Sequence, residues 1–219
     1  MPLVAKSTGS DFEPIPVGMH AAVCYGVVDL GTQPAFGNFP ARHKVLFLFE
    51  LPEERGDFER DGKRVNLPRA VSATFTLSLH PKGNLRPALV GWRGRDFTPQ
   101  EEEGFDVMNV AGANAYLNIT HTPGKGKNAN RLYADIKAIC PMPKGAPRRT
   151  AETPLLKFSL SDSPPATVPV KPANMPDWVW ARITQSDEYI LRAQGNGQPQ
   201  PTADQEANLG GPESEDIPF

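Results

Sequence analysis

Hydrophobic and polar residues alternate most regularly between Val71 and His80. The apolar residues Val71, Ala73, Phe75, Leu77 and Leu79 take turns with the polar residues Ser72, Thr74, Thr76, Ser78 and His80. A period of two is typical of a β-strand that buries one face and exposes the other. Two earlier segments, 18–30 (rich in Ala and Val) and 42–51 (dense in Val, Leu and Phe), also have strand composition. The pattern therefore predicts three consecutive strands.

Turn and helix signals surround these strands. A proline-containing loop at 32–41 and a charged, turn-like segment at 52–62, which ends on Asp-Gly, separate the three strands. A short helix is predicted over 85–92. A second helix begins at Thr98, where Thr98 and Glu101 form a capping box with proline at the first helical position.

Two more strands are predicted over 115–122 and 132–140, joined by a hairpin turn rich in Gly and Asn. Three strands, a helical segment and two strands is the order of an OB-fold, a five-stranded barrel. We therefore expect a mostly β fold class, an OB-fold-like five-stranded barrel with a helical segment between strands three and four. Residues 18–140 would form this strand-binding domain, preceded by an N-terminal arm at 1–17.

The chain changes character after the fifth predicted strand. The segment 141–176 contains nine prolines and one short predicted strand, so we expect it to wrap over the barrel. Asp177 can cap a C-terminal helix that runs to about Arg192, which completes a wrapping segment at 141–192. The Gly, Gln, Pro, Asn and acidic residues of 193–219 cannot form a core, and we expect a disordered acidic tail.

Charge is distributed unevenly between the body and the tail. The formal net charge is −2, but residues 193–219 hold five acidic side chains and no Lys or Arg. The body keeps 23 basic and 20 acidic residues, a balance of +3. Its most basic stretch, 121–149, carries seven Lys or Arg against Asp135 alone. A basic body joined to an acidic tail predicts a polyanion-binding surface and a separate acidic peptide.

Composition argues against several other classes of protein. The 24 prolines and 19 glycines are too many for a helical bundle. The longest apolar run, 45–49, is far too short to span a membrane, and the N-terminus lacks a signal-peptide core, so we expect a cytoplasmic protein. Cys24 and Cys140 lie in separate strand-like runs and are expected to be reduced core residues.

The sequence contains no catalytic or metal-binding pattern. Its four histidines lie on separate segments without metal-ligand spacing, and no phosphate-binding loop or nucleophile motif occurs. We therefore expect no enzyme activity, no cofactor and no metal site.

OB-folds bind oligonucleotides on strands two and three and on the loops that join strands one to two and four to five. We take the candidate DNA-binding residues from the corresponding segments of this chain and from its last two strands. Aromatic rings suit base stacking, and cations suit phosphates. The first loop and the strand after it provide Phe36, Phe39, Arg42 and Lys44, and the second loop provides Lys125, Lys127 and Arg131. Alternation along the last two strands turns Tyr116, Tyr133 and Lys137 outward.

Three further aromatic residues have two interpretations each. Phe47 and Phe49 either stack on bases or belong to the core, and so apolar a strand favours the core. Trp92, with the two arginines that follow it closely, is either a second basic and aromatic patch or a helix-end residue that packs inward.

The last seven residues, 213–219, have unusual chemistry for a solvated tail. An aromatic residue stands at the C-terminus beside Ile and Pro, and acidic residues precede it. The acids prevent self-burial, while the ring and the terminal carboxylate form an apolar and anionic hook for a pocket with a basic rim. The expected partner-binding residues are Glu215, Asp216, Ile217, Pro218 and Phe219.

This terminus, after further acids and a Gly-, Gln- and Pro-rich linker, resembles the acidic tip of bacterial single-stranded-DNA-binding (SSB) proteins. In that family the tip docks on repair, recombination and replication enzymes, with the final Phe in a pocket. The body is more similar to single-stranded-DNA-binding proteins encoded by bacteriophages and mobile elements. The segments that carry this looser resemblance are Pro16-Val17-Gly18, Trp92-Arg93-Gly94-Arg95 and Pro143-Lys144-Gly145. The resemblance implies action inside a bacterial host cell.

These observations together predict a sequence-nonspecific single-stranded-DNA-binding protein that protects single strands in DNA replication and recombination. Its expected partners are single-stranded DNA and, through the tip, host replication, repair and recombination proteins; no membrane is expected. A homo-oligomer is one form that the sequence allows. A recombination mediator or strand-annealing protein is the main alternative, and a protein-binding adaptor whose body does not bind DNA is the second.

Overall fold

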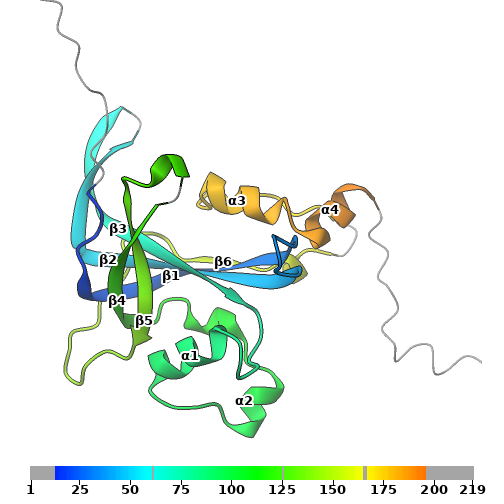
Figure 1. Cartoon of the computed structure of the whole chain (residues 1–219), viewed down its shortest axis with the longest axis horizontal. Helices are drawn as coiled ribbons and strands as arrows, with labels where there is room; N and C mark the ends of the chain where they lie inside the picture. The colour runs from blue at the N-terminus through cyan, green and yellow to red at the C-terminus, as the bar shows by residue number, and fades with distance from the viewer. Residues whose placement is uncertain (1–12, 61, 125, 165–166, 196–219) are drawn as a thin grey trace, which may run out of the picture.

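The computed structural model describes residues 13–60, 62–124, 126–164 and 167–195. Five antiparallel strands form one curled sheet in the order β3-β2-β1-β4-β5 (Figure 1). They are β1 (Gly18–Gln33), β2 (Arg42–Arg60), β3 (Lys63–Thr76), β4 (Asn114–Pro123) and β5 (Leu132–Cys140). The sheet has the shape of a half barrel, which confirms the mostly β class and the five predicted strands.

The central strand β1 uses its two edges differently. β2 pairs along one edge, while the other edge pairs antiparallel with β4 over residues 18–23 and parallel with the short strand β6 (Leu156–Phe158) over residues 26–28. Two register shifts against β2, after Cys24 and after Asp29, interrupt the regular ladder. Such shifts bend a strand and increase its twist, which helps the sheet to curl.

The β2–β3 hairpin is longer than the sequence predicts. Residues 52–60, expected as part of a charged turn, extend β2, and residues 63–70 extend β3, so that the two strands form a two-stranded arm. Polar contacts between the strands hold this arm: Arg55 Nε donates to Asn66 Oδ1 at 2.7 Å, and Arg64 pairs with Asp57 at 3.0 Å. A hairpin held by such pairs has the polar composition of a turn, so hydrophobic alternation could not reveal it.

One face of the sheet packs against the helical segment between β3 and β4. This segment contains α1 (Leu85–Arg93), α2 (Pro99–Glu103) and the 3-10 turn η1 (Val107–Val110). Leu89 and Trp92 of α1 are buried, and Trp92 Nε1 donates to the carbonyl oxygen of Asn114 at 2.8 Å. Phe47 and Phe49 of β2 are fully buried in the same core. All three aromatic residues are therefore core residues.

The opposite face of β1 and β2 is buried as well. The segment after β5 returns over it as β6, the 3-10 turn η3 (Leu160–Asp162), α3 (Asp177–Ile183) and α4 (Asp187–Ala193). Leu46 and Leu48 of β2 meet Val179 and Ile183 of α3 in a second core, where each is at most 2% exposed. In Figure 1, α3 and α4 lie beside the β1–β2 part of the sheet. This part of the chain therefore covers the outer face of the second strand.

The prediction of one C-terminal helix from Asp177 to about Arg192 is wrong, because the chain forms two short helices there. Ser186 separates them: its hydroxyl donates to the carbonyl oxygen of Ile183 at 2.7 Å and accepts from an amide in the first turn of α4 at 3.3 Å. The N-cap of α3 is Pro176 rather than Asp177. Neither helix, nor any other in the described residues, is long and apolar enough to cross a membrane.

Two buried carboxylates fasten the returning segment to the barrel. Glu50 on β2 is 1% exposed and accepts the backbone N–H groups of Glu152 and Thr153 at 2.7 and 2.8 Å. Asp29 on β1 accepts the N–H of Leu160 at 3.1 Å. Each buried carboxylate thereby finds backbone N–H donors on the returning segment, as buried polar groups require.

Both cysteines are free, as predicted, but only Cys24 is a core residue, because Cys140 is half-buried near the end of β5. Cys24 is fully buried, and this burial raises the pKa of its thiol to about 12. Because only the thiolate is reactive, Cys24 is an inert core residue.

Candidate nucleic-acid interface

A tight hairpin at the end of β1 and β2 displays two aromatic side chains. Phe36 and Phe39 exchange both backbone hydrogen bonds, at 2.9 and 3.0 Å. Gly37 makes this turn possible, because its φ of +57° lies in the left-handed region that favours glycine. Directly paired residues project to the same side of a hairpin. With 85% and 76% of their surfaces exposed, the two phenyl rings stand together in solvent. We call this segment, residues 33–42, the tip hairpin.

Two predicted cations lie at the start of β2, where the tip hairpin ends. Arg42 is exposed, and the Nζ atom of Lys44 donates to Oγ1 of Thr76 on β3 at 2.8 Å. Because they are two positions apart on one strand, Arg42 and Lys44 lie on the same face of the sheet. Neither has a carboxylate within ion-pair distance among the residues that the structure describes. Their charges are therefore available to an anionic ligand.

Arg182 of α3 is a cation at this face that the sequence analysis missed. Its Nη1 atom donates to Oγ1 of Thr74 on β3 at 3.0 Å, across 108 residues of sequence. The side chain is half-buried, and burial lowers the pKa of its guanidinium below the ordinary value. No local signal marks such a residue, because only the docking of α3 on the sheet brings it to β3.

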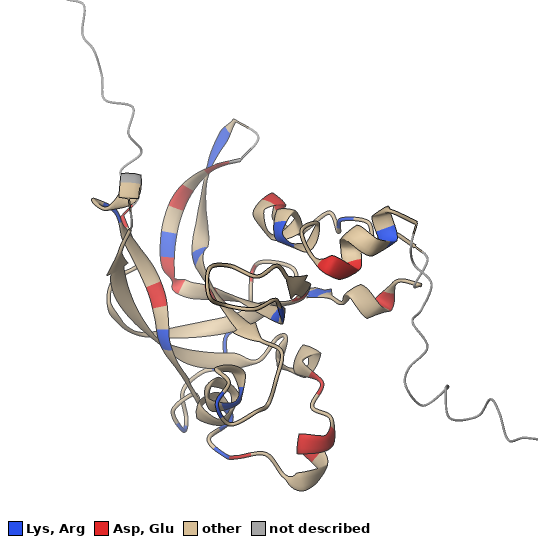
Figure 2. Cartoon of the chain, turned by 45° about the vertical axis from the view of Figure 1, so that its right-hand side comes forward, with Lys and Arg blue, Asp and Glu red and all other residues tan. Residues whose placement is uncertain are grey.

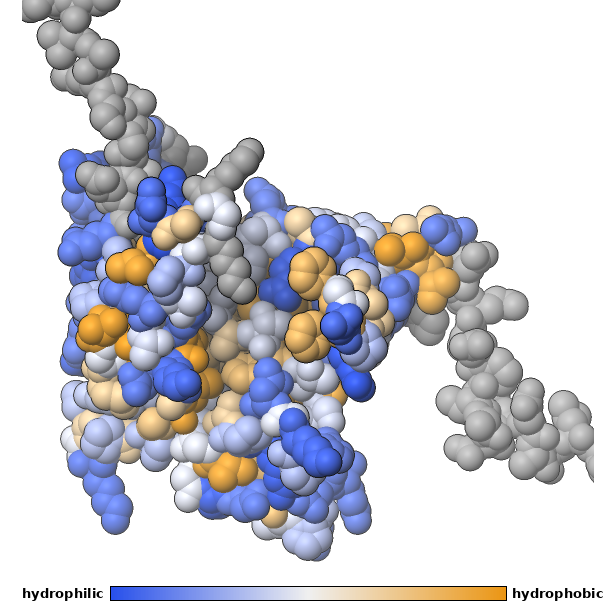
Figure 3. Space-filling model, in the orientation of Figure 1, coloured by the Kyte–Doolittle hydropathy of each residue, from blue (hydrophilic) through white to orange (hydrophobic). Residues whose placement is uncertain are grey.

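Apolar surface is exposed at the same end of the molecule. Ile190 and Leu191 of α4 are 37% and 49% exposed. Figure 3 shows hydrophobic residues over the position of α4, on the right of the view. Glu188 of α4 accepts hydrogen bonds from Thr32, which immediately precedes the tip hairpin. The exposed apolar side chains of α4 therefore lie at the same end of the sheet as the tip hairpin and its cations.

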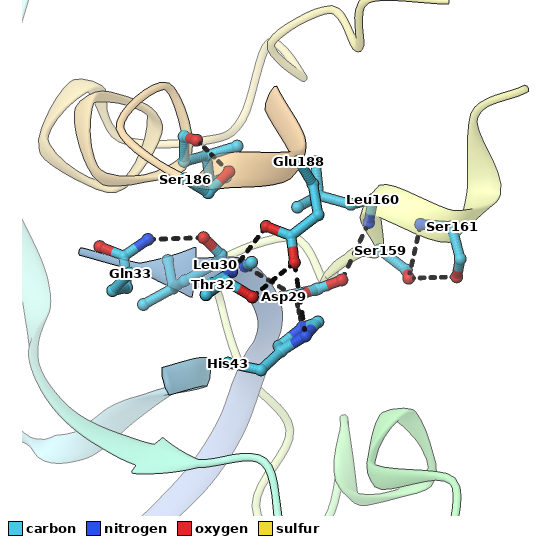
Figure 4. Close-up of polar contacts among 12 residues, drawn as sticks. Asp29, Leu30, Thr32, Gln33, His43, Ser159, Leu160, Ser161, Ser186 and Glu188 are labelled. Carbon is cyan, nitrogen blue, oxygen red and sulfur yellow. Dashed lines mark hydrogen bonds and ion pairs between the residues drawn. The ribbon is translucent and has the colours of Figure 1, made fainter. Parts of the chain in front are cut away.

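His43 links β2 to α4 through two carboxylates. Its Nε2 atom lies 2.6 Å from Oδ1 of Asp29, and its Nδ1 atom lies 3.7 Å from Oε1 of Glu188 (Figure 4). Glu188 also accepts the N–H and the hydroxyl of Thr32, both at 2.7 Å. This set, Asp29, His43, Glu188 and Thr32, holds α4 in place next to the tip hairpin, and we call it the α4 latch.

The two charged groups at the centre of the α4 latch shift each other's pKa. The hydrogen bond with Asp29 raises the pKa of His43, although burial of the imidazole acts in the opposite direction. Burial alone would raise the pKa of Asp29, but hydrogen bonds from His43 and from the amide of Gly31 outweigh it and bring the pKa below its ordinary value. Both shifts favour the ion pair.

The second predicted group lies around the β4–β5 turn. Arg131 is exposed, and Tyr133 is 45% exposed with its ring against Gly124. Lys137 is exposed at a register shift between β4 and β5. Lys125 lies outside the described residues, and of Lys127 only the backbone, in the 3-10 turn η2 (Gly126–Asn128), is described.

The two tyrosines are not close together. Tyr116 is half-buried and pairs with Ala21 on β1 and Cys140 on β5, whereas Tyr133 pairs with Thr122 at the far end of β4. Six positions along a strand correspond to about 20 Å. The structure therefore gives Tyr133 the larger exposed ring and leaves Tyr116 apart from it.

The tip hairpin and the β4–β5 turn lie at opposite ends of β1. β4 runs antiparallel to β1, and its residue Ile119 pairs with Gly18, so the turn that follows β4 lies beyond the N-terminal end of β1. The tip hairpin lies beyond the C-terminal end of β1, after Gln33. The candidate residues that the structure describes therefore fall into two separate groups rather than one patch, and Tyr116 lies away from Tyr133.

The third basic and aromatic candidate, around Trp92, is engaged in contacts within the chain. Arg93 and Arg95 both pair with Glu101, and Arg93 lies over the ring of Phe97 at 4.6 Å. The hydrogen bond from Arg95 is the largest of several causes that lower the pKa of Glu101 to about 2. Glu101 also completes the predicted capping box at the start of α2. This cluster holds the helical segment together.

Over the described residues, Lys and Arg do not collect on one face; Figure 2 shows them interspersed with Asp and Glu on most elements. Several arginines have acidic partners: the pairs are Arg55–Glu152, Arg64–Asp57, Arg86–Asp96 and Arg149–Glu53. The cations near the tip hairpin differ from these because no acid pairs with them.

A pocket of about 320 Å³ opens beside the α4 latch, between β1, β2 and η1. Asp29 and Asp106 contribute carboxylates to a lining that is otherwise mostly apolar, with Val45 and Phe105 among its residues. None of the candidate DNA-binding residues whose side chains are described lines it. The pocket is therefore separate from the predicted interface.

The predicted partner-binding residues at the C-terminus, 215–219, lie outside the described part of the chain. Within that part, no group of three or more His, Cys, Asp or Glu side chains is arranged to hold a metal ion.

In comparisons with known proteins, no family model, no curated protein and no solved structure matches the chain.

Proposed function

We propose that this chain is a sequence-nonspecific single-stranded-DNA-binding protein that protects single strands during replication and recombination in the cytoplasm of a bacterial host. The observation that carries the proposal is the exposed pair of Phe36 and Phe39, followed at the start of β2 by Arg42 and Lys44. Aromatic faces stack on any base, and cations pair with any phosphate. Together they bind a strand without reading its sequence.

An OB-fold identity of the barrel is part of this proposal. Three features support it: the strand order, the helical segment between β3 and β4, and the contact between β3 and β5 at the open side of the half barrel. OB-folds use the loop between strands one and two to bind oligonucleotides, and the tip hairpin is that loop. The returning segment after β5 covers the outer face of β1 and β2. We therefore propose that the DNA strand binds at the end of the sheet near the tip hairpin.

Recruitment of host DNA-maintenance enzymes through residues 215–219 is the second part of the proposal. Its support is the chemistry of a terminal Phe219 preceded by acids and the resemblance to the tip of bacterial SSB proteins. A terminal peptide with its own carboxylate and aromatic ring can bind a pocket on a partner enzyme by itself, without a contribution from the folded part of this chain.

The test of strand binding uses the full chain and a fluorescent oligo-dT, with affinity measured by anisotropy over a range of salt concentrations. Neutralising about four to six phosphates predicts a slope of log K against log salt of roughly −3 to −4. A mixed-sequence oligonucleotide should bind almost equally well.

Absence of binding at low salt would reject the proposal and favour the protein-binding adaptor. Assembly into large rings that pair complementary strands would instead identify a strand-annealing protein.

A further inference from the structure

Two threonines of β3 project from the open part of the sheet beside α3. Thr74 and Thr76 are two positions apart, so their side chains share a face, about 7 Å from each other along the strand. Thr76 is the cross-strand partner of Lys44, and Thr74 is the partner of Leu46, which α3 covers. The threonines therefore mark the border between the covered and the uncovered parts of the outer face.

Each threonine hydroxyl accepts a hydrogen bond from a different cation. Lys44 Nζ donates to Thr76 Oγ1 at 2.8 Å, and Arg182 Nη1 donates to Thr74 Oγ1 at 3.0 Å. A hydroxyl that accepts from a cation keeps its own O–H to donate. The arrangement thus presents two cations and two hydroxyl donors side by side, all of them suited to anionic oxygens.

The charge of Arg182 is not compensated within the described residues. No carboxylate lies within ion-pair distance of it, whereas Arg55, Arg64 and Arg149 each have one. Desolvation is the cause that lowers the pKa of Arg182, so holding this cation half-buried has a cost that a bound anion would offset. A neutral threonine alone does not offset it.

We propose that Lys44 with Thr76, and Arg182 with Thr74, bind two consecutive phosphates of a single DNA strand whose bases reach the rings of the tip hairpin. This inference rests on the proposed function and adds α3 to the binding site. The spacing of the two threonines is comparable to that of neighbouring phosphates in an extended strand. The guanidinium of Arg182 offers a fork of donors for phosphate oxygens, while Lys44 acts as a point charge.

The test compares three full-length variants that lose one positive charge each. Lys44→Met and Arg182→Met remove the proposed phosphate contacts and keep most of the aliphatic stem. Arg64→Met is the matched control, because Arg64 is exposed and pairs with Asp57 on the β2–β3 arm. Affinity for oligo-dT is measured against salt, and the melting temperature of each variant is recorded.

We expect Lys44→Met and Arg182→Met each to weaken binding about tenfold and to reduce the salt slope by about 0.7. The double variant should reduce the slope by about 1.4. Arg182→Lys should keep the slope, because it keeps the charge. Arg64→Met should leave both affinity and slope close to those of the native chain.

A purely structural role of Arg182, as a tether of α3, would lower the melting temperature of Arg182→Met without changing the slope. That result, or unchanged slopes in both variants while the native chain binds, would overturn the inference and leave the proposed function intact. If Arg182→Met does not fold, Lys44→Met and Arg182→Lys carry the test. A native chain that does not bind oligo-dT would overturn both proposals.

Discussion

The Nε2 atom of His43 lies 2.6 Å from Oδ1 of Asp29 on the neighbouring strand, while the other ring nitrogen faces Glu188 of α4. The ion pair that results depends on pH. His43 has a raised pKa, so its contribution to stability is complete below its ordinary pKa of 6.5 and is lost as the pH rises through the raised value. Asp29 has a lowered pKa, so its contribution is complete above 3.8 and is lost as the pH falls through the lowered value.

The first prediction follows from this window. His43→Gln should destabilise the protein most between about pH 4 and 6.5, and much less at alkaline pH, where the native imidazole is neutral. The imidazole is partly exposed, so solvent screening limits the effect to about 1 kcal/mol or less. Urea unfolding of both proteins at several pH values measures it. His80→Gln, on an exposed loop, is the control; a destabilisation of His43→Gln that does not vary with pH would contradict the ion pair.

The second prediction concerns the two rings of the tip hairpin. Phe36→Ala and Phe39→Ala should each weaken oligo-dT binding by about 1–3 kcal/mol and leave the salt slope unchanged, because stacking releases no counterions. Stability should hardly change, since both rings are in solvent. Phe58→Ala is the matched control, because Phe58 is an exposed phenylalanine on the β2–β3 arm. Equal losses in all three variants would mean that the tip hairpin is not the stacking site.

The third prediction concerns Glu50, the buried carboxylate that holds the returning segment. Glu50→Ala leaves the part-buried amides of Glu152 and Thr153 without their acceptor. This should cost about 2–4 kcal/mol of unfolding free energy. Glu53→Ala removes an exposed carboxylate that pairs with Arg149 and should cost at most about 1 kcal/mol. Chemical denaturation compares the two, and similar losses would show that Glu50 is not a special anchor.

The fourth prediction uses the distance between the two candidate groups. A strand of about 6 nucleotides occupies one group at most, and a strand of about 30 can reach both. Because the proposed site for a single short strand is the tip hairpin, replacing Arg131 and Tyr133 should weaken binding of the long strand and leave binding of the short one unaffected. Anisotropy titrations of both lengths measure this. A loss that is equal for both lengths would mean that the two groups form one site.

The fifth prediction concerns the C-terminal residue. Deleting Phe219 removes the ring and moves the carboxylate to Pro218, and adding one residue after it keeps the ring but displaces the charge. Both changes should cost about 2–4 kcal/mol in binding to an enzyme that accepts bacterial SSB tips. Fluorescent peptides with native, shortened and extended ends allow a direct titration. Identical affinities for all three would reduce the tip to a simple acidic tail.

Alternation in the sequence was sufficient to predict much of the barrel. In β3, Val71 and Phe75 face the core as predicted, but Leu77 and Leu79 lie beyond the strand, which ends at Thr76. The strand ends there because the chain turns, with the amide of Ser78 bonded to the carbonyl oxygen of Thr76. Periodicity detects which face is buried, but it does not detect where such a turn interrupts the strand.

The candidate site was predictable only where a local pattern carries it. Phe36 and Phe39 are unusual in a proline-containing loop, so composition reveals them. Arg182 acts on Thr74 through the docking of a helix more than a hundred residues away, and one arginine on a short amphipathic helix has no distinctive context. The separation of Tyr116 from Tyr133 likewise depends on strand register, which alternation alone leaves open.

The hydrogen bond between Thr32 and Glu188 spans 156 positions, and this has a consequence for synthesis on the ribosome. β1 and β2 emerge early, but α3 and α4, which cover their outer face, emerge almost last. Until then the apolar side chains of that face, such as Leu46 and Leu48, have nothing to pack against. Contacts so distant in sequence slow folding and prolong the exposure of aggregation-prone surface. A nascent chain that stalls or is cleaved after β5 would therefore aggregate, even though all five strands of the half barrel have been made.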